Sequence, residues 1–98
     1  MISEQEAEKK IEQEIASYPL PEGDRYVLLK EHTITKDWGW VYFYTSEKWN
    51  QTGELQYAVA GNAPFIVEKA TGNVIVTGTA ESVENYINRY ETTSNPHA

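Results

Sequence analysis

A six-residue run from Trp40 to Thr45, Trp-Val-Tyr-Phe-Tyr-Thr, is apolar or aromatic at both odd and even positions. Aromatic and β-branched side chains suit the pleated surface of a β-sheet. A strand that is apolar on both sides is covered on both faces, or by large aromatics on one. The run therefore predicts a central strand, and because 98 residues leave room for one core, the rest of the chain has to cover it.

Other segments alternate or carry turn signals in the manner of strands. Two apolar runs flank Ala70-Thr71-Gly72, which predicts a hairpin with Gly72 in the left-handed conformation. Residues 46–54 are polar except for Trp49 and are interpreted as a loop. The predicted strands cover residues 25–35, 40–45, 55–59, 65–69 and 73–77.

The first segment has the signature of a helix. Ser3 and Glu6 have the spacing of a capping box, in which each side chain accepts a hydrogen bond from the other residue's backbone N–H. Pro19 and Pro21 end the helix because proline has no N–H to donate. The predicted apolar stripe consists of Ala7, Ile11, Ile15 and Tyr18.

A second helix is predicted after Gly78. Thr79 is its expected N-cap, and Glu81 is expected in the first turn, where the helix dipole favours an acid. Its apolar stripe is Val83, Tyr86, Ile87 and Tyr90. Residues 92–98 are expected to form a flexible tail.

The order helix, about five strands, helix predicts a two-layer α+β domain in which both helices cover one apolar face of an antiparallel sheet. Most connections are too short for the crossovers of a parallel sheet. We expect residues 1–98 to form a single domain.

The charge balance narrows the class of partner. Fifteen acidic and eight basic residues give a net charge of −7, which argues against nucleic acid and against an anionic membrane surface. The charge permits a protein partner with a basic surface, and the alternative is that it only maintains solubility. No cysteine occurs, no apolar run is long enough to span a membrane, and the start is polar, so we expect a cytoplasmic protein.

Reactive groups are scarce. His97 lies in the expected tail and His32 in a strand that becomes polar, with no metal-ligand spacing around either residue. The sequence contains no nucleophile elbow and no phosphate-binding glycine motif. We therefore predict a protein that is not an enzyme and that has no metal or cofactor.

The aromatic residues outside the helices suggest two roles. Trp40 is expected in the core, whereas Trp38 precedes a glycine beside Asp37 and is expected to be partly exposed. Trp49 is isolated in a polar segment, where it either folds back as a lid on the core or serves as a binding anchor.

Two blocks resemble a known family: Gly39-Trp40-Val41-Tyr42-Phe43-Tyr44, and the stretch from Val59 to Gly72 that contains Ala60-Gly61-Asn62-Ala63-Pro64. They are similar to the immunity protein 35 family, which includes the YrhB-like proteins, and the resemblance spans about residues 5–91. It implies a small α+β protein without enzymatic activity that binds and neutralises a cognate bacterial toxin. The family pairs with varied toxins, so the resemblance names no target.

The matching residues also have plain structural roles. The motif positions are Gly39, Trp40, Gly61, Asn62, Pro64 and Gly72. We interpret the three at positions 61, 62 and 64 as scaffold that shapes a turn and the entry into a strand, with toxin contact as the alternative.

The resulting hypothesis is stoichiometric inhibition by occlusion of a basic toxin surface. Aromatic side chains would be the buried anchors, and carboxylates would supply steering and register. The candidate contacts are Asp37, Trp38, Glu47, Trp49 and Glu54. The alternative is a chaperone-like, stress-related interaction module without a dedicated toxin. An unpaired edge strand leaves open a monomer or a weak homodimer.

Overall fold

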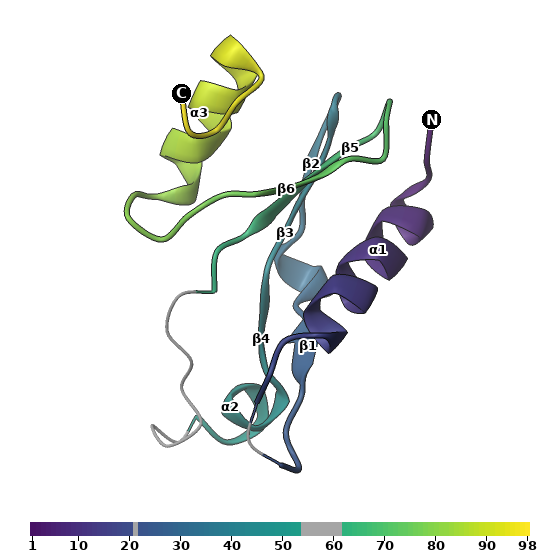
Figure 1. The fold of residues 1–98 in the computed structure, drawn as a ribbon, viewed down its shortest axis with the longest axis vertical. Coiled ribbons are helices and arrows are strands. Elements are labelled where there is room, and N and C mark those ends of the chain that lie inside the picture. The colour runs from purple at the N-terminus through teal and green to yellow at the C-terminus, as the bar shows by residue number, and fades with distance from the viewer. Residues whose placement is uncertain (21, 54–61) are drawn as a thin grey trace.

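A computed structural model describes residues 1–20, 22–53 and 62–98, with a helix near each end of the chain and strands and a short helix between them (Figure 1). The α+β class with antiparallel pairing is confirmed, and the described ranges contain six short strands in two sheets. The elements are α1 (Glu4–Ala16), β1 (Tyr26–Leu28), η1 (Lys30–His32), β2 (Ile34–Lys36), β3 (Gly39–Tyr42), β4 (Tyr44–Ser46), α2 (Glu47–Thr52), β5 (Phe65–Glu68), β6 (Val74–Val76) and α3 (Val83–Thr93).

The first two predicted strands form one long hairpin that is interrupted midway. β1 pairs with β4, and β2 pairs with β3. Leu29 donates its backbone N–H to Phe43 at the break, with an N···O distance of 2.8 Å. The next paired residues are Ile34 and Val41. Five residues separate Leu29 from Ile34, but only two separate Phe43 from Val41 on the opposite strand, so the first strand has three extra residues, which form the 3₁₀ turn η1. The prediction of two unbroken strands over residues 25–35 and 40–45 is therefore wrong in detail.

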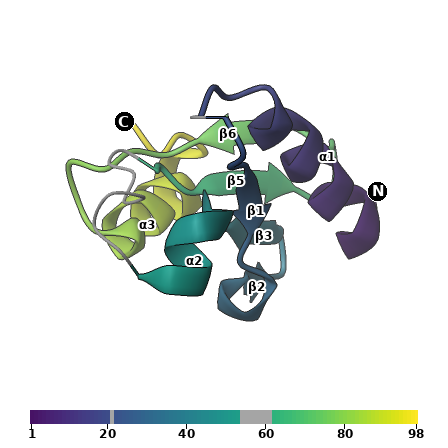
Figure 2. The same ribbon diagram turned by 90° about the horizontal axis from the view of Figure 1, so that it is seen from below.

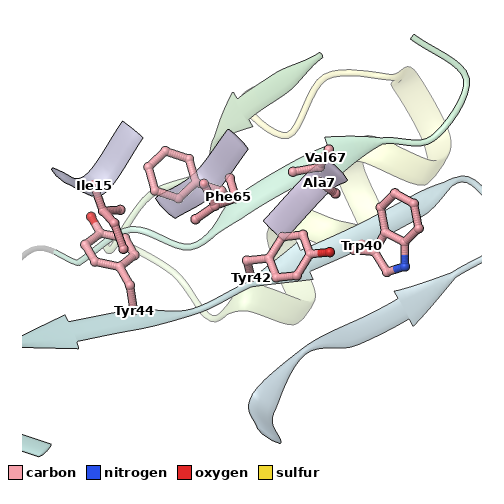
Figure 3. Close-up of a cluster of buried hydrophobic side chains, with 8 residues drawn as sticks. Ala7, Ile15, Trp40, Tyr42, Tyr44, Phe65 and Val67 are labelled. Atoms are coloured by element: carbon pink, nitrogen blue, oxygen red, sulfur yellow. The ribbon is translucent and has the colours of Figure 1, made fainter. Parts of the chain in front are cut away.

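The central strand β3 is buried along its whole length. In the four-stranded sheet, whose order is β2-β3-β5-β6, it lies between β2 and β5. One face contributes Trp40, Tyr42, Phe65 and Val67 to a core cluster under α1, as Figure 3 shows. Ala7, Ile11 and Ile15 are the α1 residues in that cluster, which confirms the apolar stripe predicted for the first helix.

The opposite face of the same sheet is covered by α3. Val41 and Ile66 pack there against Ile87 and Tyr90. The two helices thus lie on opposite faces, so the layers are helix, sheet, helix rather than two helices over one face. This arrangement explains why the run from residue 40 is apolar at odd and even positions alike: each parity meets a different helix.

The β5–β6 hairpin is confirmed. Gly72 has φ of +77°, and its N–H donates to the Glu68 carbonyl at 2.8 Å. A residue with a Cβ is strained in this left-handed conformation, which is why glycine suits the turn.

Two further boundaries differ from the sequence predictions. α3 is capped by Ser82, whose hydroxyl accepts from Asn85 N–H, so Thr79 is not the N-cap. Glu81 lies before the helix and forms an ion pair with Arg89. Residues 46–52, expected in a loop, hold the N-cap and helix of α2. The strand predicted over residues 55–59 lies outside the described residues.

The chain end was expected to be flexible from residue 92. In the structure α3 continues to Thr93, and Pro96 is buried. The His97 Nε2 atom lies 2.8 Å from the Val76 carbonyl oxygen. The last residues thus contact the edge of the sheet.

Candidate functional site

The candidate contact residues fall in two separate places. Asp37 and Trp38 lie in the turn between β2 and β3, whereas Glu47 and Trp49 lie on α2 at the other end of the molecule (Figure 1). The fifth candidate, Glu54, lies outside the described residues. The structure therefore does not gather these side chains into one patch.

Trp38 holds α3 against the sheet. Its indole Nε1–H donates to Glu91 Oε2 at 3.0 Å, and its ring lies 4.5 Å from the Tyr90 ring, centroid to centroid. Lys36 approaches the same Glu91 carboxylate at 3.8 Å. The side chain is half-buried, and both its polar and its apolar parts are engaged within the chain. Its neighbour Asp37 is exposed.

At the other end, Asp24 organises the start of α2. Its carboxylate accepts hydrogen bonds from the Ser46 hydroxyl and from the backbone N–H of Lys48. The Ser46 hydroxyl in turn accepts from Trp49 N–H at 3.2 Å, so serine and aspartate together cap the helix. The Ser46 hydrogen bond is the main reason why the pKa of Asp24 lies below its ordinary value.

The first turn of α2 is also tied down by charge. Arg25 donates from Nε and Nη2 to Glu47 Oε2, at 3.1 and 2.8 Å. This fork fixes the orientation of the carboxylate. α2 is therefore a small helix held at its N-terminus by Asp24, Ser46 and Arg25.

Trp49 is presented by this helix. It is half-buried and, within the described part of the chain, belongs to neither core cluster. A half-exposed tryptophan on a fixed helix suits a binding anchor. Neither Asp24 nor the helix was identified from sequence, although Ser46 is a favoured N-cap residue and Glu47 an acid suited to the first turn of a helix.

The motif residues near β3 are packed against backbone. A Cβ added at Gly39 would overlap the carbonyl oxygen of Val67 on the neighbouring strand. Trp40 is 4% exposed, as predicted for a core residue, and the Lys69 ammonium lies over its ring.

The second motif block joins β4 to β6. Asn62 Nδ2 donates to the Tyr44 carbonyl at 3.2 Å. The Pro64 carbonyl accepts from both the N–H and the hydroxyl of Thr77, at 2.9 and 2.6 Å. These contacts support the scaffold interpretation for Asn62 and Pro64, while Gly61 lies outside the described residues.

A hollow of about 290 Å³ lies between α1 and β1. Its charged lining residues are Glu12, Arg25 and Lys30, and the rest of its wall includes Ile15, Tyr26 and Leu28. Arg25 and Lys30 are paired with Glu47 and Glu8. Across residues 1–20, 22–53 and 62–98, no group of three or more metal-ligating side chains converges. The helices in these ranges are all too short or too polar to cross a membrane.

Comparison with known proteins identifies the family. A family model described as Immunity protein 35 matches residues 5–90. Uncharacterized protein YrhB of Escherichia coli (strain K12) is 33% identical over 76 residues, which are 78% of this chain and 80% of that protein. No solved structure matches. The match of the family model to nearly the whole chain shows that this protein belongs to the immunity protein 35 family.

Proposed function

We propose that this protein binds a cognate bacterial toxin and neutralises it by stoichiometric occlusion, without catalysing a reaction. The observation that carries the proposal is the family match over residues 5–90. The compact three-layer core supports it, because a rigid surface binds without the entropic cost of ordering loops.

Charge supports a toxin with a basic surface. Among the described residues, ion pairs with carboxylates are seen at Arg25, Lys30, Lys36 and Arg89. The chain has seven more acidic than basic residues, and this net negative charge can attract a partner. An opposite field on the toxin speeds encounter and fixes orientation. Cytoplasmic residence, where an incoming toxin would be met, is part of the same proposal.

The α2 end of the molecule is our first choice for the toxin-binding surface. Trp49 would be the anchor, and Glu47, held in place by Arg25, would give register. Glu54 follows closely in the sequence and stays in the candidate set. Asp37 and Trp38 form a second candidate, ranked lower because the Trp38 indole is already bonded to Glu91.

A pair of tryptophan variants tests the choice of surface. Trp49→Ala should weaken toxin binding about 30-fold or more, the range of a hot-spot residue, while the melting temperature changes little. Trp38→Ala should lower the melting temperature because it removes the contact with Tyr90, and it should leave the affinity of the folded protein nearly unchanged. Binding would be measured by calorimetry with the product of the adjacent toxin gene, made as an inactive variant.

Growth rescue in cells that make the toxin tests the function itself. The wild-type protein should restore growth in proportion to its amount, as expected for a one-to-one inhibitor. Normal rescue by Trp49→Ala would reject the α2 surface but not the function. Absence of any complex between the two wild-type proteins would reject the function.

The alternative is a chaperone-like module without a dedicated toxin. The half-exposed Trp49 and the exposed Val74 and Val76 favour it, since apolar surface binds unfolded chains. Suppression of the heat aggregation of unrelated proteins at stoichiometric amounts, together with no adjacent toxin gene, would support this function instead.

A further inference from the structure

The two borders of the four-stranded sheet differ in chemistry. β2 and β6 are the border strands, as Figure 2 shows. β2 ends in Lys36, which pairs with Glu91, and Asp37 follows directly. Residues 73–77 around β6 carry no charge, and the side chains of Val74 and Val76 are 37% and 47% exposed. Charge on an edge strand discourages pairing with another chain, so β6 lacks the protection that β2 has.

The backbone of β6 has groups available for pairing. Thr77 N–H donates to Pro64, and Glu68 N–H donates to Asn73, so these two residue pairs are hydrogen-bonded pairs of the β5–β6 ladder. Such pairs alternate along an antiparallel ladder. The N–H and C=O groups of Val74 and Val76, which lie at the alternate positions, therefore point away from β5.

The chain's own C-terminus covers one of these groups. His97 Nε2 lies 2.8 Å from the Val76 carbonyl oxygen, which confirms that this carbonyl points outward. In the described part of the chain, no other hydrogen bond reaches the outer side of β6. The imidazole thus occupies a position that a neighbouring strand's N–H would take.

We propose that β6 pairs antiparallel with β6 of a second copy of this chain, about a two-fold axis at Ile75. Val74 would then lie opposite Val76 of the second copy, and the outward N–H and C=O groups of both residues would bond across the axis. The sheet would continue across the dimer, with β6 next to β6. This inference does not rest on the proposed toxin function.

The strand is self-complementary, which is why a second copy is the occupant. Val74 and Val76 point to the same face because they are two residues apart. The antiparallel register places each valine beside the other valine of the second copy, so all four leave water together. The uncharged segment adds no repulsion at the contact itself. The interface is small, the two chains each carry −7, and His97 competes for Val76, so the dimer is weak and favoured by salt.

A single cysteine tests the register, since the chain has no cysteine of its own. Ile75 and Ile75 of the second copy would form a non-hydrogen-bonded pair, with Cα atoms about 4.5 Å apart, within disulfide range. Ile75→Cys should therefore form a disulfide-linked dimer in an oxidising glutathione buffer. Val74→Cys is the control, because its two copies would lie about 8 Å apart, too far to bridge.

The expected result is cross-linking of Ile75→Cys at least about tenfold faster than of Val74→Cys, although residue 74 is the more exposed of the two. Equal rates, or faster cross-linking at residue 74, would overturn the register, since random collision favours the exposed thiol.

Light scattering over a range of protein concentrations tests the association without a substitution at the half-buried Ile75. The wild-type mass should rise toward twice 11.2 kDa with concentration and with salt. His97→Ala should shift this rise to lower concentration, and Val76→Lys should abolish it by placing two charges in the interface. A mass that stays at one chain up to about 1 mM protein, in both the wild type and His97→Ala, would reject the dimer.

Discussion

Gly39 shows how one residue can be fixed by a contact on the neighbouring strand. It begins β3 opposite Glu68, and the Val67 carbonyl occupies the place where a side chain would start. This explains why position 39, directly before the core residue Trp40, is a glycine. The sequence shows the glycine but not the contact that requires it, since Val67 is 28 residues away.

Gly39→Ala should cost about 3 kcal/mol of unfolding free energy, because the new Cβ forces the two strands apart. Gly53→Ala is the matched control. Gly53 has a positive φ of +68°, but no atom of the described residues lies within 4 Å of the position that its Cβ would take, so about 1 kcal/mol is expected from backbone strain alone. Urea unfolding followed by tryptophan fluorescence would measure both. Equal losses in the two variants would show that backbone conformation, not the Val67 contact, fixes the residue.

The hydrogen bond between Tyr90 and Glu68 ties α3 to the sheet and has a signature in pH. The Tyr90 hydroxyl donates to Glu68 Oε2 at 2.6 Å, and this bond is the main reason why the pKa of Glu68 lies below its ordinary value of 4.5. A lowered carboxyl pKa stabilises the fold above the unfolded-state pKa, and that stabilisation is lost as pH falls through the folded-state pKa.

Tyr90→Phe should therefore cost about 1 kcal/mol at pH 7 and less at pH 3, because the stabilisation that comes with the lowered pKa of Glu68 is lost as pH falls. The measurement is the free energy of unfolding of the wild type and the variant between pH 3 and pH 7. If the variant loses the same free energy of unfolding at pH 3 and at pH 7, the loss comes from packing and not from the hydrogen bond to the carboxylate. Glu68→Gln, which keeps the shape of the side chain but cannot titrate, should likewise reduce the fall of the unfolding free energy below pH 4.5.

At the scale of elements, α2 is short but unusually well capped. Ser46 is fully buried and joins Asp24 to the first turn, whereas Ser82 at the start of α3 is exposed and makes one long bond, 3.4 Å, to Asn85. Both are N-cap serines, but only the first takes part in a network. The network is what allows a helix of six residues to persist, since such a helix is unstable alone.

Ser46→Ala should cost about 2 kcal/mol, the upper end for a cap, and Ser82→Ala about 0.5 kcal/mol. Hydrogen exchange at the backbone amides of α2 should accelerate in the first variant and stay unchanged in the second. If α2 carries the toxin surface, Ser46→Ala should also weaken toxin binding. Unchanged exchange in Ser46→Ala would show that Asp24 alone is enough to cap the helix.

Local signals explain which elements the sequence predicted correctly. The capping box at Ser3 and Glu6 and the turn at Gly72 each depend on residues a few positions apart, and both are confirmed. The break at Phe43 and the turn η1 depend on a register shift between two distant segments, which alternation within one segment does not reveal. α2 was missed because its anchor Asp24 lies 22 residues before Ser46.

At the scale of the whole molecule, the sequence allows two arrangements of β3: covered on both faces, or covered by large aromatic side chains on one face. Alternation identifies apolar faces but not which helix meets which face, so the prediction that both helices cover one face is wrong. The candidate contacts were separated for the same reason. Asp37 and Glu47 are ten residues apart, yet a hairpin that runs the length of the molecule carries them to opposite ends.

The charge of the whole molecule should act on the rate of toxin binding, and the anchor on its lifetime. Long-range attraction between an acidic protein and a basic toxin is screened by salt, since the Debye length falls from about 10 Å at 0.1 M to about 3 Å at 1 M. The association rate constant should therefore fall about tenfold or more over this range, with little change in the dissociation rate constant.

Two variants separate these contributions. Glu84→Gln on α3 should slow association slightly without affecting dissociation, because Glu84 is exposed on a helix at the other end of the molecule from α2 (Figure 1) and its loss changes only the field. Trp49→Ala should do the reverse, because its loss is felt only after contact. Stopped-flow tryptophan fluorescence would give both constants. A salt-independent association rate would mean that the net charge of −7 serves solubility alone, and the basic-surface proposal would then fail even if the toxin is bound.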